Sequence, residues 1–416
     1  MAHEGEERLH ILVVTQYFWP ENFKINDMVK EMCAKGHRIT VLTGMPNYPE
    51  GKIPKSYRWF KRSTEDYYGA TVIRSPLVSR GSGEGVRLGL NYLSFALSAT
   101  VIGLMRCREN YDALFVYEPS PITVGIPAVV LKRKFKIPLI LWVQDLWPDS
   151  LIATGAVSSP MVISGFDKLV KYIYNRCDFI LVQSLAFIPW IKKYGIPSDK
   201  INYLPNWAED VYKPTYELDA SRDLQYKSLL PEGFIIMFAG NLGESQNLGM
   251  IVEAAERLRE HHEIHWVMVG DGRRKEWMEK EVRLRQLDSC IHFVGKYPIE
   301  VMPYFFSVAD GLLLTLKKDP IFSLTIPSKL QSYLASGRPI IASIDGEGGR
   351  ILQSSGGGLV CPADDIEALA ESVLQLYRMP VERRQHMAQC GRSYYEQHFD
   401  RDKLLAYVER VIHEAV

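Results

Sequence analysis

Short apolar runs alternate with stretches in which apolar residues recur every three or four positions along most of this 416-residue chain. The runs have the length of strands, and the periodic stretches between them are typical of amphipathic helices. In the first half the runs lie at 9–15, 38–43, 70–75, 112–117, 137–143, 178–183 and 201–204. In the second half they lie at 234–239, 264–269, 291–294, 311–316, 339–343 and 358–361. Strands separated by helices pair in parallel, so the pattern predicts an α/β fold with parallel sheets.

The alternation breaks once, after PNWAED (205–210), where a polar stretch continues to about Glu232. A chain of this length suits two domains of roughly 200 residues each. We therefore predict domains at 1–207 and 208–399. An amphipathic final helix at 400–416 is expected to pack back on the first domain.

Both halves open with the same kind of unit. LHILVVTQ (9–16) leads to a helix near Asn26, and FIIMFAGNLGESQNLG (234–249) leads to a helix through Leu258. A strand, a tight loop and a helix together offer backbone N–H groups and a positive helix end to a phosphate. The repetition predicts two Rossmann-like domains with a ligand held between them.

The overall composition excludes several classes of protein. Lysines plus arginines number 49, as do aspartates plus glutamates, so no net field attracts nucleic acid. The cysteines form no CxxC pair, which favours a reducing compartment and argues against a disulfide framework or a zinc site. The polar start MAHEGEERLH has no signal-peptide core, so we expect a cytoplasmic protein.

A family resemblance rests on strings that occur in order through both halves. They are QYFWPENFKIN (16–26), VLTGMPNYPEGK (41–52), WVQDLWPDS (142–150), AGNLGESQNLG (239–249), VGDGRRKEW (269–277), FVGKYP (293–298) and TIPSKLQSYLASGRPI (325–340). The chain resembles the GT-B glycosyltransferases of family four, and within them the bacterial WbuB-like branch of L-fucosamine transferases.

The resemblance implies the GT-B architecture, with two facing Rossmann-like domains. The first would bind the acceptor, a saccharide linked to undecaprenyl diphosphate, and the second a nucleotide-sugar, UDP-linked. It implies transfer with retention at the sugar carbon, without metal or cofactor, in O-antigen, capsule or exopolysaccharide synthesis. N-acetyl-L-fucosamine is the sugar that the nearest branch suggests.

Breaking a sugar–phosphate bond leaves negative charge on a diphosphate, which preplaced donors must stabilise. The loop from Gly240 precedes a helix start. The turn Pro327-Ser328-Lys329 predicts another helix start with a lysine beside it. Arg273, after the GDG turn, is either a third anion contact or part of a sharp strand-to-helix turn. We expect the donor to be bound by Gly240, Asn241, Gln246, Arg273, Lys296, Pro327, Ser328, Lys329 and Ser332.

The chain departs from the wider family at the donor positions. Asn241 and Gln246 stand where many members have arginine and lysine, and amides donate hydrogen bonds without charge. Ser332 and Leu324 stand at the positions of two glutamates, which leaves ribose recognition by a carboxylate open. Lys329 is then the leading candidate for the missing positive charge.

Acidic residues follow two apolar runs of the first half, where side chains reach the cleft of an open α/β sheet. Glu118 and Asp145 are expected to contact the acceptor hydroxyl or the reacting sugar, and with Lys329 they form the predicted catalytic set. The alternative is that such a residue caps the next helix, which is the interpretation we favour for Asp149. His37 is expected to be a surface turn residue, and His261, His262 and His265 to be structural.

The segment at 88–105 carries no charge and is almost long enough to span a membrane. We expect a helix buried in the domain in preference to a membrane span. A surface helix that is partly sunk in the lipid interface is the intermediate possibility. The basic run KRKFK (132–136) either attracts anionic lipid or is a solvated helix end. The family context favours a protein on the inner face of the cell membrane.

Two other functions remain open at this point. Because charged donor residues are reduced, the chain could be a catalytically silent GT-B subunit that binds a partner transferase. It could also be a GT-B epimerase that acts on a nucleotide-sugar without an acceptor.

Overall fold

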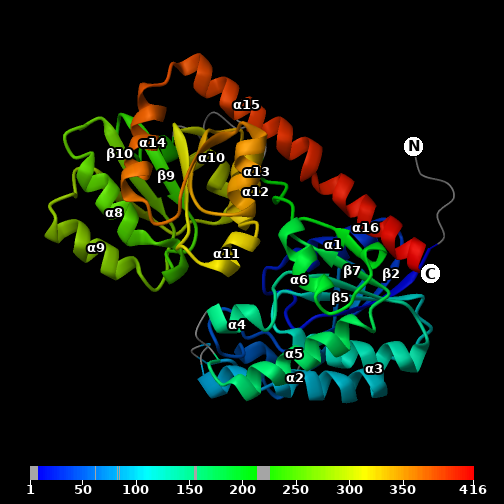
Figure 1. Cartoon of the computed structure of the whole chain (residues 1–416). Helices are drawn as coiled ribbons and strands as arrows, with labels where there is room; N and C mark the ends of the chain where they lie inside the picture. Colours follow the sequence, from blue (N-terminus) through cyan, green and yellow to red (C-terminus); the bar gives the residue numbers. More distant parts are fainter. Residues whose placement is uncertain (1–7, 61, 82, 84, 154–156, 213–224) are drawn as a thin grey trace. The chain divides into compact units, whose positions relative to one another are not determined.

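The computed structural model describes residues 8–60, 62–81, 83, 85–153, 157–212 and 225–416 (Figure 1). Its contacts divide the chain into two compact units, Met1–Leu204 with Leu405–Val416, and Pro205–Leu404. The sequence predicted a boundary at 207/208, within PNWAED. Residues 213–224 of the polar stretch that follows lie outside the described part. The final helix, predicted from residue 400, contributes its residues from Leu405 onward to the first unit.

The first unit is built on an eight-stranded sheet of order β3-β4-β2-β1-β5-β6-β7-β8. Its strands are β1 (His10–Val14), β2 (Arg38–Gly44), β3 (Thr64–Tyr67), β4 (Ala70–Ser75), β5 (Ala113–Glu118), β6 (Leu139–Val143), β7 (Phe179–Val182) and β8 (Ile201–Tyr203). Its helices are α1 (Lys24–Ala34), α2 (Gly85–Arg106), α3 (Gly125–Phe135), α4 (Asp149–Ala153), α5 (Pro160–Tyr174) and α6 (Ile188–Lys192), with short 3-10 turns η1 (Lys55–Phe60), η2 (Ile122–Val124), η3 (Leu185–Phe187) and η4 (Ser198–Lys200). Helix α3 packs against both α2 and α5, and the three lie side by side in Figure 1.

Strand β3 is the element of this sheet that the hydrophobic pattern does not predict. Its sequence, TEDY, is polar, and three of its four residues are exposed or half-buried. It pairs antiparallel with β4, while the other neighbouring strands of this sheet pair in parallel. An edge strand buries little apolar surface, so it leaves no apolar run for sequence analysis to find.

The second unit is built on a six-stranded parallel sheet of order β11-β10-β9-β12-β13-β14. Its strands are β9 (Phe234–Ala239), β10 (Ile264–Val269), β11 (Ile291–Gly295), β12 (Gly311–Thr315), β13 (Ile340–Ser343) and β14 (Gly358–Cys361). Its helices are α8 (Leu248–Arg257), α9 (Lys275–Leu284), α10 (Met302–Ser307), α11 (Pro320–Leu324), α12 (Ser328–Ser336), α13 (Glu347–Ser355), α14 (Ile366–Arg378) and α15 (Val381–His398), with 3-10 turns η6 (Glu244–Gln246) and η7 (Ile299–Val301) and the final helix α16 (Arg401–Ala415).

An aspartate before a central strand recurs as a connection between neighbouring strands. The carboxylate of Asp112, before β5, accepts the N–H of His10 at 2.7 Å, and that of Asp178, before β7, accepts the N–H of Leu139 at 2.7 Å. In the second unit, Asp310 before β12 accepts the N–H of Ile235 at 3.0 Å. Each bond pairs a backbone donor at the amino edge of a sheet, where the ladder begins.

The predicted α/β fold with two Rossmann-like parallel sheets is confirmed. Strands β9 and β12 are neighbours in space but not in sequence, because the chain reverses its direction of growth across the sheet between them. In open α/β sheets a ligand binds beside such a switch point, at the carboxyl ends of the strands.

Candidate functional site

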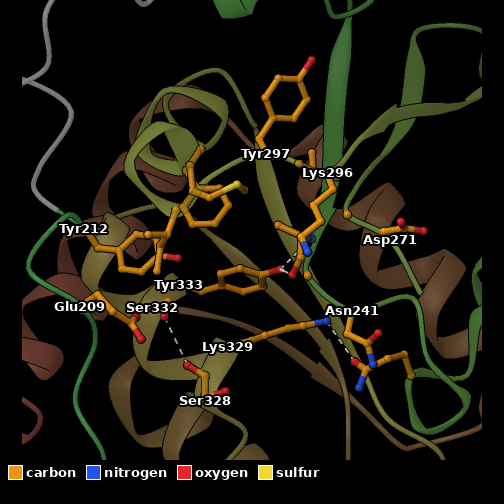
Figure 2. Close-up of a pocket in the computed structure, with 18 residues that line it drawn as sticks. Glu209, Tyr212, Asn241, Asp271, Lys296, Tyr297, Ser328, Lys329, Ser332 and Tyr333 are labelled. Atoms are coloured by element: carbon orange, nitrogen blue, oxygen red, sulfur yellow. Dashed lines mark hydrogen bonds between the residues drawn. The ribbon is translucent and has the colours of Figure 1, made fainter. Parts of the chain in front are cut away.

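A pocket of about 580 Å³ lies at that position in the second unit (Figure 2). Its floor comes from the residues that follow β9, β10 and β11, and one side comes from the first turns of α12. It is lined by Glu209, Tyr212, Ala239, Gly240, Asn241, Gln246, Val269, Gly270, Asp271, Lys296, Tyr297, Ile299, Met302, Phe306, Ser328, Lys329, Ser332 and Tyr333.

Helix α12 presents one face to this pocket. Pro327 is its N-cap, with φ −64° and extended ψ, so the helix begins one residue later than the sequence suggested, at Ser328. Ser328, Lys329, Ser332 and Tyr333 line the pocket because they lie one helical turn apart. The first N–H groups of a helix have no partner within it, so this end offers donors and the positive end of the helix dipole.

Lys329 is held between two groups, one from β9 and one from the loop that follows it. Its Nζ donates to Gln246 Oε1 at 3.0 Å and lies 3.5 Å from the centre of the Phe238 ring. Burial lowers the pKa of Lys329 from 10.5 to about 7. An ammonium that has lost its water gains most from an arriving anion, so this lysine is suited to a diphosphate.

Two glycines let the loops after β9 and β10 meet beside Lys329. Gly240 has φ +131°, and a Cβ there would lie 2.7 Å from Lys329 Cε. Gly270 has φ +146°, and a Cβ there would lie 1.9 Å from the carbonyl oxygen of Gly240. Both positions require glycine for conformation and for space. The GDG turn therefore packs against the loop that begins at Gly240.

The predicted donor residues fall into two groups. Gly240, Asn241, Gln246, Lys296, Ser328, Lys329 and Ser332 all line the one pocket. Pro327 lines a smaller neighbouring cavity that shares Gln246, Ser328 and Lys329 with it. Arg273 is exposed and is not among the described residues that line either cavity. This position fits the alternative in which Arg273 belongs to the strand-to-helix turn.

A further part of the pocket lining was not predicted from the sequence. Tyr297, Ile299, Met302 and Phe306 come from the segment between β11 and β12. Glu209 and Tyr212 come from the segment after β8, which the sequence analysis used only to place a domain boundary. The one available signal was PNWAED itself, a compact string with two carboxylates close to a tryptophan.

Comparison with known proteins identifies the family. A family model described as "Glycosyl transferases group 1" matches residues 233–379, and one described as "Glycosyl transferase 4-like domain" matches residues 23–207. Together the two models cover most of the chain. The chain belongs to the group 1 glycosyltransferases.

The relatives of this glycosyltransferase are distant. WcaI of Escherichia coli (strain K12), named for colanic acid biosynthesis, is 26% identical over 391 residues, which cover 91% of this chain and 92% of WcaI. A GDP-mannose-dependent alpha-mannosyltransferase of Mycobacterium tuberculosis is 22% identical over 92% of this chain and 91% of its own length. The crystal structure of Anabaena HepE in complex with UDP superposes with a TM-score of 0.71 at 12% identity, covering 98% of this chain and all of that one. The GT-B fold is thereby shown.

In the first unit of the glycosyltransferase, Glu118 and Asp145 lie close together. Glu118 is fully buried as the last residue of β5. Burial, and next the charge of Asp145, raise the pKa of Glu118 well above its usual value. Asp145 accepts the Ser150 hydroxyl at 3.0 Å, and burial raises its pKa to about 6. Glu118 is therefore held as a neutral acid.

Asp149 and the histidines take structural positions. Asp149 is the first residue of α4 and forms an ion pair with Lys193 at 3.3 Å. His265 is buried and hydrogen-bonds His292 at 3.1 Å.

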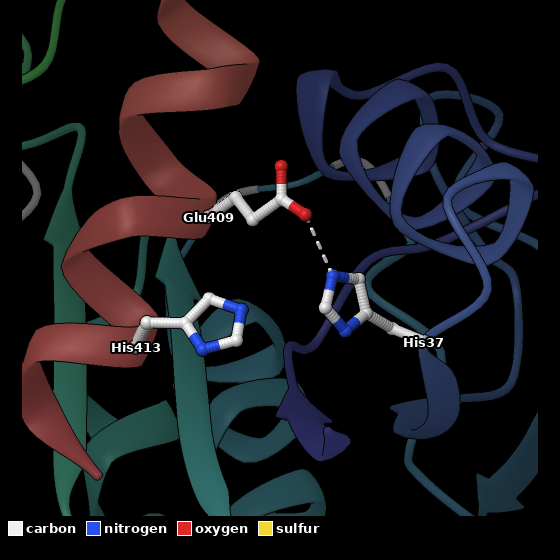
Figure 3. A group of neighbouring side chains, drawn as sticks. All are labelled: His37, Glu409 and His413. Carbon is white, nitrogen blue, oxygen red and sulfur yellow. Dashed lines mark hydrogen bonds and ion pairs between the residues drawn. The ribbon is translucent and has the colours of Figure 1, made fainter. Parts of the chain in front are cut away.

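His37 is buried, so its prediction as a surface residue was wrong. Figure 3 shows it with Glu409 and His413 of α16, a group whose ligand atoms lie within 4.8 Å of one another. Leu9 N–H donates to His37 Nδ1 at 3.2 Å, and His37 Nε2 meets Glu409 Oε1 at 2.9 Å. Because Nδ1 accepts, the ring proton of neutral His37 sits on Nε2 and is donated to Glu409. A metal ion on Nε2 would need that proton removed as well, so the His37–Glu409 hydrogen bond is a structural contact that holds α16.

Helix α2 buries only one face. It is long and apolar enough to pass a membrane-span test by length and composition, and 28% of that window is buried. Asn91, Phe95, Ala96, Ala99 and Gly103 are buried. Asn91 accepts from Gln16 at 2.7 Å. The exposed face carries Val86, Leu90, Leu93, Leu97, Val101, Leu104 and Met105. The expectation of a buried helix is corrected to a half-buried one with an apolar outer stripe.

Proposed function

We propose that this glycosyltransferase moves a sugar from a UDP-linked donor to a saccharide carried on undecaprenyl diphosphate, in bacterial polysaccharide synthesis. The reaction is metal-independent and retains the configuration at the sugar carbon. The observation that carries the proposal is Lys329, a desolvated lysine at a helix start, beside Gln246 and the Gly240 loop.

The chemistry of this pocket supports a diphosphate leaving group. As the sugar–phosphate bond breaks, negative charge grows on the diphosphate, and donors already in place stabilise that charge. Lys329 and the N–H groups at the start of α12 can supply this stabilisation without a metal ion. Asn241 and Gln246 add neutral amide donors. The names of relatives support a polysaccharide role, since WcaI is named for colanic acid biosynthesis.

We further propose that the protein is cytoplasmic and rests on the inner face of the cell membrane through α2. Its exposed apolar stripe is suited to the acyl boundary, and Arg87 and Arg106 lie near its two ends. The basic run at 132–136 contributes less to the attraction of anionic lipid than its sequence implies. Lys132 pairs with Asp178 at 2.5 Å, and Lys134 donates to two backbone carbonyls.

Acceptor-dependent release of nucleoside diphosphate tests the proposal. The purified protein is mixed with UDP-, GDP- and TDP-sugars, UDP-N-acetyl-L-fucosamine first, with a lipid-linked saccharide acceptor and EDTA. We expect UDP release only with acceptor present, and NMR of the product should show the anomeric configuration of the donor. Turnover lost in EDTA and restored by manganese would contradict metal independence.

The two other functions give different outcomes in the same assay. An epimerase would convert the donor to another sugar without acceptor. A silent subunit would release no nucleoside diphosphate with any donor and acceptor, and either outcome would overturn the proposal.

A further inference from the structure

The two ends of the Lys329 pocket differ in chemistry. One end has Lys329, Ser328, Gln246 and Asn241, which are charged or polar donors at the start of α12 and after β9. The other has Tyr297, Ile299, Met302 and Phe306, which are aromatic or apolar. A nucleoside diphosphate that places its phosphates at the first end would place its base against the second. The ribose then lies between them.

Two carboxylates line this pocket, and their positions differ. Asp271 is exposed, and its Oδ1 accepts the N–H of Gly272 at 2.8 Å, so it belongs to the GDG turn. Glu209 is half-buried and lies beside Ser332 and Tyr212 in Figure 2. Ser332 is one helical turn beyond Ser328, whose carbonyl its hydroxyl contacts at 3.4 Å. Because Glu209 lies beside Ser332, it is about one helical turn of α12 away from the diphosphate end of the pocket.

The neighbours of Glu209 form an ordered wall. The ring of Tyr212 stacks on Phe306 with centroids 5.6 Å apart and planes at 10°. Its hydroxyl hydrogen-bonds the Ser332 hydroxyl, and the Glu209 charge acts on it. Arg392 donates to the backbone carbonyl of Tyr212 at 3.1 Å, which anchors this segment to the second unit. Glu209 is therefore part of a built wall of the pocket.

We propose that Glu209, with Ser332 beside it, binds the ribose diol of the donor and makes the site selective for ribonucleotides. The proposal rests on the proposed function. A carboxylate can accept hydrogen bonds from two neighbouring hydroxyls, and such charge-assisted bonds are stronger than neutral ones. Many family members have a glutamate at the position of Ser332. Glu209, which comes from the segment before the second sheet, would supply the carboxylate that α12 lacks there.

Calorimetric titration with UDP and its 2′-deoxy and 3′-deoxy analogues tests the proposal. Wild type should bind at least one deoxy analogue on the order of tenfold to a hundredfold more weakly than UDP. Glu209→Gln should weaken UDP binding and largely remove this difference between UDP and the analogue. Asp210→Asn, an exposed carboxylate next in the chain that does not line the pocket, is the matched control and should behave as wild type.

The outcomes separate this inference from the function on which it rests. If Glu209→Gln discriminates between UDP and the deoxy analogues as strongly as wild type, the inference is wrong and the function stands. If wild type binds neither UDP nor GDP, both fail. A melting temperature of Glu209→Gln equal to that of wild type ensures that lost binding does not come from unfolding.

Discussion

At the residue scale, the surroundings of Lys329 disfavour the charged form of its side chain. Burial lowers its pKa to about 7, and its ammonium donates a hydrogen bond to the neutral amide of Gln246. A diphosphate would supply the counter-charge that this position lacks. Lys329 can thus take the role of the arginine and lysine that many family members have at positions 241 and 246.

We predict that Lys329→Ala lowers kcat/KM on the order of tenfold to a few hundredfold, since a charge-assisted bond to phosphate is worth about 1.5–3 kcal/mol and more in the transition state. Lys329→Arg should recover only part, because a planar guanidinium does not fit a point-charge site. Ser332→Ala should cost much less. Steady-state kinetics of nucleotide release checks each variant.

Arg273→Ala is the control for this series, because Arg273 is exposed and does not line the pocket. Near-wild-type turnover in Lys329→Ala together with an inactive Arg273→Ala would show that the phosphate charge had been assigned to the wrong residue.

Residues differ in how far the sequence reveals their role. Lys329 was predicted because proline, serine and lysine together mark a helix start within three positions. Glu209 was missed because its relation to Ser332 joins positions far apart in the chain and leaves no local pattern. Glu118 follows an apolar run, but the sequence does not show that its side chain is fully buried. A side chain at the end of a strand can either reach a loop or be enclosed, as it is here.

The neutral, buried Glu118 predicts a pH dependence of stability. Its pKa is raised in the folded protein, while in the unfolded chain it is near 4.3. Folding therefore keeps a proton that the unfolded chain releases, and stability falls as pH rises above about 4.3, by up to about 1.4 kcal/mol per unit. Glu118→Gln should lessen this fall between pH 5 and 7 in urea unfolding. The exposed Glu50→Gln is the control, and parallel curves for wild type and Glu118→Gln would refute the prediction.

At the element scale, the strands were predictable and their pairing partly so. Every predicted apolar run became a strand, because buried parallel strands need continuous apolar sequence. The polar strand β3 was missed for the same reason. The exposed face of helix α2 was not predictable, since an apolar sequence does not reveal which side of the helix other elements cover.

Helix α16 should depend on its contact with His37. Glu409 is buried, and its carboxylate accepts from Lys35 Nζ at 2.5 Å and from His37 at 2.9 Å. Glu409→Ala should lower the free energy of unfolding by about 1–3 kcal/mol, because it leaves the buried ring of His37 without its acceptor. Chemical unfolding of the full chain measures this, with the exposed Glu414→Ala as control. A variant as stable as the control would show that the contact does not hold α16.

The apolar stripe of α2 predicts binding to lipid. Sedimentation with vesicles should show more binding to anionic than to neutral lipid, and binding should fall with ionic strength, because salt screens Arg87 and Arg106. Leu93→Glu with Leu97→Glu should abolish it, since both side chains are at least half exposed, at 52% and 69%. Equal binding to neutral and anionic vesicles, or none to either, would count against the membrane proposal.

At the scale of the whole molecule, the two units divide the chemistry of the predicted site. The Lys329 pocket belongs wholly to the second unit, and Glu118 and Asp145 belong to the first. The architecture followed from the repeated alternation of strands and helices, which is a property of the whole sequence. The identity of the sugar and acceptor does not follow in this way, because it depends on a few contacts that no repeated pattern encodes.

The central claim is that the Lys329 pocket binds the diphosphate of the donor, and proton uptake on binding tests it most directly. UDP is titrated calorimetrically at pH 8 in two buffers of different ionisation enthalpy, with EDTA present. At this pH the phosphates are ionised, whereas Lys329, with a pKa of about 7, is mostly neutral until the anion binds. Wild type should take up a proton, and its affinity should fall as pH rises above 7. Lys329→Met should bind at least tenfold more weakly and take up none. Equal affinity in the two proteins, with no proton uptake in either, would contradict the account.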